Sequence, residues 1–294
     1  MRKLAQVLIF AVACMLAAWA HAQSDALRVP ERIVANTGAT LATSGSGDAT
    51  FCLFSPSGAL KKNVRLGEEI KLQPEDVRAA GSYTAVLRAG ATNTVRTFYV
   101  APAPPTAISF LARPSRVPVD RPGVISGVAF VFDDYKNLVL DPTDVSFRLA
   151  VGDAPPVARS VATRSGIAWT SMGSSKRAGA AQFVASLPSS GSQQEVRRVV
   201  QQTASDPCNL RFHTQPAKTG VVVETDPVRD CTGNPVPDGT IVTFTEFDGH
   251  TRSTIDARIK RGVARAELPA EPGATISVAS GVVLGNELRV GGTQ

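Results

Sequence analysis

The sequence predicts an all-β protein in which three tandem antiparallel β-sandwiches follow a cleaved signal helix. Short stretches alternate apolar and polar side chains, as in Val145/Phe147/Leu149, and such alternation is typical of strands with one buried face. Sustained helical periodicity is absent beyond the N-terminus, which disfavours a parallel sheet with crossover helices. An internal repeat and two proline-containing linkers divide the chain into modules of the size of small sandwiches.

Residues 1–22 are typical of an export signal. The basic pair Arg2-Lys3 precedes an apolar run, and this run ends in an Ala-x-Ala site at Ala20-His21-Ala22. We therefore expect cleavage after Ala22, so that the mature chain begins at Gln23 and is periplasmic, exposed on the cell surface or secreted.

Two other fates of this segment stay open. A retained membrane anchor would need a longer apolar run than this one. A lipoprotein processed at Cys14 would place Ala11 where leucine is usual, and the apolar run continues past that cysteine. No later segment is long and apolar enough to span a bilayer, so we expect no transmembrane segment after removal of the signal.

Two linkers set the expected module bounds. Residues 101–105, Ala-Pro-Ala-Pro-Pro, form an extended linker because proline fixes the backbone and cannot enter a central strand. Pro, Asp and Asn cluster again between residues 204 and 216. The sequence therefore predicts one sandwich over 23–103, a second over 107–203 and a third over 208–294.

A repeated motif links the second and third modules. Residues 131–147, VFDDYKNLVLDPTDVSF, reappear without a gap as VRDCTGNPVPDGTIVTF at 228–244. The shared residues have a structural explanation that needs no ligand. The aspartates, Asp133 and Asp230, are expected to cap turn amides. The asparagines, Asn137 and Asn234, tolerate a left-handed backbone, and the valines, Val139 and Val236, are expected to plug the end of the sandwich.

The third copy of the motif resembles the signature of bacterial Ig-like domains of the invasin and intimin type, D-x-x-G-N-P-V-P-x-G-T-x-V-x-F. The second copy departs from it, with Tyr135-Lys136 in place of small turn residues. The first module lacks the signature, but Gly81-Ser82-Tyr83-Thr84-Ala85 resembles a strand of general Ig-like sandwiches in which the tyrosine forms a corner hydrogen bond. The resemblance implies Ig-like sandwiches, and members of this family are often adhesins.

Three cysteines remain after removal of the signal, in an oxidising compartment. A bridge between Cys208 and Cys231 would close a loop of 24 residues, tie the second linker to the third module and stabilise it by roughly 3 kcal/mol. Cys52 lies in the apolar stretch Phe51-Cys52-Leu53-Phe54 and is expected to be a buried free thiol that packs as a small hydrophobic residue.

The charge pattern argues against nucleic-acid binding. The chain has a formal net charge of +6, and loss of Arg2 and Lys3 leaves 29 basic against 25 acidic residues. Basic residues are scattered, and no aromatic residues alternate with them. This mild positive charge favours anionic surfaces only weakly.

The sequence contains few residues and no motifs typical of catalytic sites, so we expect the protein not to be an enzyme. Beyond the signal only His213 and His250 occur, one in a linker and one in a turn, and neither has a metal-ligand spacing. Nucleophile elbows, phosphate-binding loops and dinucleotide fingerprints are absent. Trp169 and Phe183 are expected to pack in the core of the second module, and a sugar-stacking role of Trp169 is the alternative.

The leading hypothesis is an exported, non-enzymatic Ig-like repeat protein that acts as a stalk or interaction module, with a protein or glycan partner at the cell envelope. The alternative is a soluble periplasmic or secreted binder of carbohydrate or calcium. Calcium is the one cofactor considered. Its candidate ligands are Asp133, Asp134, Asp141 and Asp144, because carboxylates suit a hard cation, although no dense D-x-D-x-D run is present.

Overall fold

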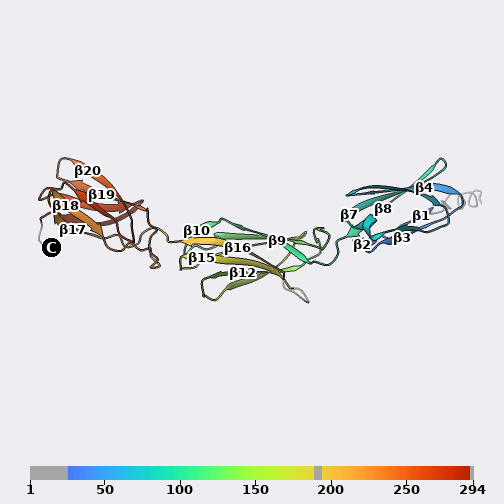
Figure 1. The fold of residues 1–294 in the computed structure, drawn as a ribbon, viewed down its shortest axis with the longest axis horizontal. Helices are drawn as coiled ribbons and strands as arrows, with labels where there is room; N and C mark the ends of the chain where they lie inside the picture. Colours follow the sequence, from blue (N-terminus) through green and yellow to red (C-terminus); the bar gives the residue numbers. More distant parts are fainter. Residues whose placement is uncertain (1–25, 189–193, 292–294) are drawn as a thin grey trace, which may run out of the picture. The chain divides into compact units, whose positions relative to one another are not determined.

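The computed structural model describes residues 26–188 and 194–291. Within these ranges the chain forms 23 strands in six sheets and one short 3-10 turn, and the sheets pair into three sandwiches (Figure 1). The fold class is therefore the predicted one. The signal segment 1–22, with Cys14 and the cleavage site at Ala22 and Gln23, lies outside the described residues. No helix in the described part of the chain is long and apolar enough to cross a membrane.

The first sandwich contains β1 to β8 and the 3-10 turn Pro74–Val77. Its three-stranded sheet has the order β1 (Leu27–Arg28), β3 (Ala39–Thr43), β6 (Ile70–Leu72). Its five-stranded sheet has the order β2 (Arg32–Val34), β8 (Thr92–Ala101), β7 (Gly81–Ala89), β4 (Asp48–Ser55), β5 (Gly58–Arg65). Strand β2 pairs with β8 in parallel, whereas β4, β5, β7 and β8 pair antiparallel.

Tyr83 lies at the centre of the first core and forms the expected corner. Its ring is fully buried and stacks on Phe98 with the centroids 5.4 Å apart. Its hydroxyl donates to the carbonyl of Ala79 at 2.8 Å, so the one polar atom of the ring is satisfied. Burial raises the pKa of Tyr83 above its ordinary value.

The second sandwich repeats this arrangement. Its three-stranded sheet has the order β14 (Ile167–Met172), β11 (Ile125–Phe132), β9 (Ala107–Arg113). Its five-stranded sheet has the order β10 (Arg116–Pro118), β16 (Gln194–Thr203), β15 (Gly179–Leu187), β12 (Asp144–Val151), β13 (Val157–Ala162). A cluster of three fully buried rings, Phe110, Phe147 and Phe183, fills its core.

The third sandwich is smaller. One sheet has the order β17 (Phe212–Ala217), β18 (Gly220–Thr225), β21 (Arg265–Leu268). The other has the order β20 (Arg252–Arg258), β19 (Ile241–Phe247), β22 (Thr275–Ser280), β23 (Val283–Arg289). Phe212 and Phe244 meet edge to face in its core, with the centroids 5.7 Å apart.

The chain divides into two compact units that do not follow the predicted module bounds. Among the described residues, one unit contains those up to Ala107 together with Val131–Thr143 and Arg164–Gly166, and the other contains Ile108–Phe130, Asp144–Thr163 and those from Ile167 onward. Residues 131–143 of the first copy of the repeated motif thus cluster with the first sandwich. The bounds 23–103, 107–203 and 208–294 stay predictions.

Candidate functional site

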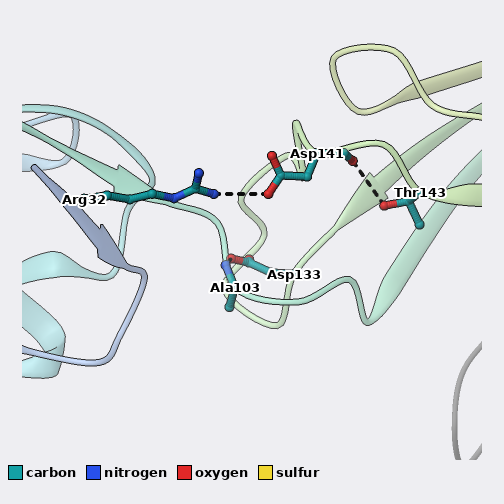
Figure 2. Close-up of polar contacts among 5 residues, drawn as sticks. All are labelled: Arg32, Ala103, Asp133, Asp141 and Thr143. Carbon is teal, nitrogen blue, oxygen red and sulfur yellow. Dashed lines mark hydrogen bonds and ion pairs between the residues drawn. The ribbon is translucent and has the colours of Figure 1, made fainter.

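Asp133 is the third residue of the first copy of the repeated motif, and it is 1% exposed. The backbone amides of Tyr135 and Asn137 donate to Oδ1 at 2.9 and 2.8 Å, which confirms the expected turn cap. The backbone amide of Ala103 donates to Oδ2 at 2.9 Å, and Figure 2 shows these two residues side by side. The side-chain amide of Asn137 adds a fourth bond at 2.8 Å. One buried charge therefore organises the turn and holds the preceding linker.

Asn137 serves a purpose that the sequence did not reveal. Its Nδ2 donates to the carbonyl of Arg78 at 2.9 Å, and its Oδ1 accepts from the amide of Ala80 at 2.8 Å. The side-chain amide therefore bonds the segment before β7 in the first sandwich. Asn137 does not use the left-handed backbone that asparagine tolerates, because the positive φ of this turn, 66°, belongs to Lys136.

Asp230 in the second copy accepts the same kind of hydrogen bonds as Asp133, from two amides of its own turn and one amide of the preceding linker. The amides of Thr232 and Asn234 donate to Oδ1 at 2.9 Å each, and the amide of Ser205 donates to Oδ2 at 3.0 Å. Burial of the carboxylate opposes its ionisation, but the hydrogen bonds from Thr232, Ser205 and Asn234 outweigh burial and lower the pKa of Asp230 below its ordinary value.

Asn234 likewise repeats the contacts of Asn137 with an earlier loop. Its Nδ2 donates to the carbonyl of Lys176 at 2.7 Å, and its Oδ1 accepts from the amide of Ala178 at 2.8 Å, just before β15. In this copy too the positive φ, 87°, belongs to the preceding residue, Gly233. We call Asp133 with Asn137 the first clamp, and Asp230 with Asn234 the second clamp. Each bonds one linker amide and one loop that precedes the motif in the chain.

The first clamp has polar neighbours that the second lacks. Asn36 donates from Nδ2 to the hydroxyl of Tyr135 at 2.8 Å, which explains why this copy carries a tyrosine where small turn residues are usual. Arg32 and Asp141 form an ion pair at 3.1 Å (Figure 2), with side chains that are 59% and 74% exposed. Exposure of this degree leaves the pair weak.

The second clamp has a disulfide instead. Cys208 and Cys231 are bonded, with their Cα atoms 4.7 Å apart, as the sequence predicted. Cys231 directly follows Asp230, so the bridge fixes the second linker to the motif beside the carboxylate that holds Ser205. The amide of Cys208 also donates to the carbonyl of Arg229 at 3.0 Å.

Of the four candidate calcium ligands, two have polar partners within the protein and two are exposed. The Asp133 carboxylate accepts the four bonds described above, and Asp141 pairs with Arg32. Asp134 and Asp144 are exposed. Across residues 26–188 and 194–291, no three His, Cys, Asp or Glu side chains form a group that could hold a metal ion.

The two histidines lie at the surface of the third sandwich. His213 on β17 is 42% exposed, with Nδ1 3.8 Å from Oδ1 of Asp226. His250 occupies the exposed turn between β19 and β20, where its amide donates to Asp248. Hydrogen bonds from Thr251 and from the amide of His250 lower the pKa of Asp248 to about 2.

Two sequence-based expectations about burial were wrong. Cys52 is a free thiol of intermediate exposure, because Phe51 and Leu53 take the core-facing positions of β4. Trp169 is 60% exposed on β14, whereas Phe183 is fully buried as expected. In both strands large or apolar residues occupy both faces, so alternation alone could not identify the buried face.

Comparison with solved structures identifies the fold type. The chain is similar to FdeC, an Escherichia coli adhesin, at a TM-score of 0.58 and 13% identity, over 90% of this chain and 96% of that one. Invasin, a bacterial integrin-binding protein, gives 0.52 and 12% identity, over 90% of this chain and 60% of the invasin chain. InvD of Yersinia pseudotuberculosis gives 0.51 and 12%, over 90% and 96%. These likenesses support the Ig-like fold of the invasin and intimin type.

Sequence comparison adds nothing to this result. No protein-family model matches the chain, and no curated protein matches it in sequence.

Proposed function

We propose that this protein is an exported, non-enzymatic array of Ig-like sandwiches that acts as a stalk or interaction module at the cell envelope or outside the cell. Cleavage between Ala22 and Gln23 would release the mature chain. The two clamps carry the proposal, because the residues that the motif repeats are used to bond neighbouring parts of the array.

The clamps favour a mechanical role over a chemical one. In each clamp the carboxylate accepts a short hydrogen bond from a linker amide, and the carboxamide donates one to a loop carbonyl and accepts one from a loop amide. Linkers rich in proline are already stiff, and bonding one of their amides restricts them further. An array built in this way would hold its sandwiches at defined spacings, as a stalk requires.

The similarity to FdeC, invasin and InvD supports an interaction role by analogy of fold. FdeC is an adhesin and invasin binds integrin. We extend to this chain the coarser idea that a sandwich array presents a surface to a partner, which would be a protein or a glycan.

Scattering in solution tests the stalk. We expect the wild-type mature chain to give a narrow range of particle dimensions by small-angle X-ray scattering, and the double variant Asn137→Ala/Asn234→Ala to give a broader one. The measurement is repeated in millimolar calcium and in EDTA. We expect the same profile in both, because amide donors already occupy the Asp133 and Asp230 carboxylates.

Asn286→Ala is the matched control. Asn286 accepts from the amide of Phe212 at 2.9 Å and donates to its carbonyl at 3.0 Å, which is the same two-bond pattern within one sandwich. Its loss should leave the scattering profile unchanged. Identical profiles for the wild type and the double variant would contradict the stalk, and a contraction or extension on adding calcium would favour the calcium-binding alternative.

A further inference from the structure

The second sandwich carries an exposed apolar surface on its three-stranded sheet. Trp169 and Ile167 on β14 are 60% and 39% exposed, and Leu111 on β9 is 50% exposed. Val128 and Phe130 on β11 are half-buried and lie opposite Trp169 and Ile167 in the register. We call the surface formed by these five residues the β14–β11–β9 face.

The middle of β11 and β14 places larger apolar side chains on the outer face than on the inner one, unlike an ordinary half-buried sheet. The central inward positions of β11 and β14 hold small or polar residues, since the register pairs Gly127 with Thr170 and Ala129 with Ala168. The larger buried residues Ile125, Val131 and Met172 lie toward the ends of these strands. Large side chains would not fit there, since a Cβ atom on Gly127 would lie 2.7 Å from the ring of Phe183.

The large residues at the middle of β11 and β14, Val128, Phe130 and Trp169, face outward and therefore contribute little to the core. They leave apolar area in water that burial would stabilise by about 25 cal/mol per Å², so folding alone does not explain them. Contiguous exposed apolar surface of this kind marks interaction sites in soluble proteins.

The equivalent sheets of the other two sandwiches are polar on their outer sides. In the third, Glu224 on β18 lies opposite Arg265 on β21, and Glu267 is exposed. In the first, Thr40 on β3 lies opposite Lys71 on β6, and both are exposed. The apolar outer face is thus specific to the middle sandwich and is not a general property of the module.

The charge around the β14–β11–β9 face is positive. Strands β9, β11 and β14 contain no Asp or Glu, and Arg113 is exposed at the end of β9. Arg159 on β13 reaches the edge of β14, where it donates to the carbonyl of Ser171 at 3.3 Å. Residues 108–130, 144–163 and 167–203 together hold nine basic and four acidic residues.

We infer that the β14–β11–β9 face docks a partner protein through a segment that combines apolar side chains with net negative charge. This inference rests on the proposed function, and it names the surface and the chemistry of the partner. Exposed Trp and Arg side chains are the residues that most often dominate protein interfaces. Five apolar side chains on one sheet face favour a protein over a sugar, which needs several converging polar groups. A second copy of this chain would bring like charges together, which favours an acidic partner.

Peptide selection tests the inference. A random peptide library is selected on the wild-type mature chain and counter-selected on Trp169→Ser, a change at an exposed position that should leave the fold intact. We expect the enriched peptides to carry net negative charge and at least two large apolar residues. Their affinity should fall at least tenfold on Trp169→Ser and severalfold on Arg113→Glu, and should weaken with added salt.

Val199→Ser is the control for Trp169→Ser. Val199 is 64% exposed, and its position on β16 in the five-stranded sheet places it away from the β14–β11–β9 face. Arg198→Glu is the matching charge control. Enriched peptides that bind both serine variants equally, or that are neutral or basic, would overturn the inference.

Two further results would also overturn it. One is a dimer in sedimentation velocity that Trp169→Ser abolishes, which would make a second copy the occupant. The other is a glycan array signal that depends on Trp169 while the peptide selection yields no binder. Because these measurements report on one sandwich face, their failure leaves the scattering test of the stalk unaffected.

Discussion

The two clamps use the same Asp and Asn but are reinforced differently. At the first, Tyr135 accepts a hydrogen bond from Asn36, and Arg32 pairs with Asp141. At the second, the Cys208–Cys231 disulfide lies directly beside the clamp aspartate. The first is reinforced by polar contacts to the first sandwich, and the second by a covalent link from its own linker.

This difference indicates which parts of the device are general. The carboxylate and the carboxamide keep the same bonding pattern in both copies, so they form the common element. The reinforcements vary with the local sequence, and they decide how each linker responds when the common element is removed. Comparing matched variants at the two clamps separates the two contributions.

Removal of the clamp aspartates should have the largest effect. Asp133→Ala leaves the amides of Ala103, Tyr135 and Asn137 without their acceptor, and Asp230→Ala does the same to Ser205, Thr232 and Asn234. We expect each to lower the free energy of unfolding by about 3 kcal/mol, as for hydrogen bonds to a buried charge, in urea unfolding. Limited proteolysis should then cut residues 101–106 in Asp133→Ala, whereas the disulfide should protect residues 204–208 in Asp230→Ala until it is reduced.

Asp248→Ala is the control, since Asp248 caps an exposed turn through the amides of His250 and Thr251 away from both clamps. Equal protease sensitivity of the two linkers before reduction would contradict the idea that the disulfide reinforces only the second clamp.

The pH dependence of stability provides a second check. Because the pKa of Asp230 is lowered in the folded state, its contribution is present above the ordinary value of 3.8 and is lost as the pH falls through the lowered value. The gap in stability between the wild type and Asp230→Ala should therefore narrow below about pH 4.

Loss of the disulfide should have an effect of similar size, and only on the third sandwich. Reduction, or Cys208→Ser with Cys231→Ser, should lower the free energy of unfolding by roughly 3 kcal/mol, because the bridge restricts the unfolded chain. Differential scanning calorimetry should show one shifted transition, and Cys52→Ser should shift none. Thiol counting on the unreduced mature chain should find one thiol, and finding three would reject the bridge.

The sequence predicted the parts of this structure that depend on local pattern. Alternation identified the sandwiches, the Cys208 and Cys231 positions suggested their bond, and Tyr83 formed the corner expected from the Gly81 to Ala85 strand. The turn cap by Asp133 was predictable because the backbone amides that donate to its carboxylate lie within four residues of it.

The features that the sequence did not predict depend on hydrogen-bond partners far away in the chain or on the volume of core side chains. Asn137 bonds residues 57 and 59 positions away, which no local rule indicates, so its conformation was predicted from turn preference alone. The exposure of Trp169 follows from how Phe110 and Phe183 fill the space above Gly127. Glycine and alanines at core-facing positions indicate that the large residues between them face outward. This can be recognised only once the buried face of the strand is known.

The ion pair between Arg32 and Asp141 should have the smallest effect. Both side chains are more than half exposed, so a double-mutant cycle with Arg32→Ala and Asp141→Ala should give a coupling of at most about 0.5 kcal/mol, and this should vanish in high salt. Tyr135→Phe, which removes the acceptor of the Asn36 bond, is the comparison, and its larger effect should persist in salt because that contact is partly buried. A coupling above about 1 kcal/mol for the ion pair would mean that charge contributes substantially to the reinforcement of the first clamp. In that case high salt would weaken the first clamp selectively, just as reduction of the disulfide would weaken the second.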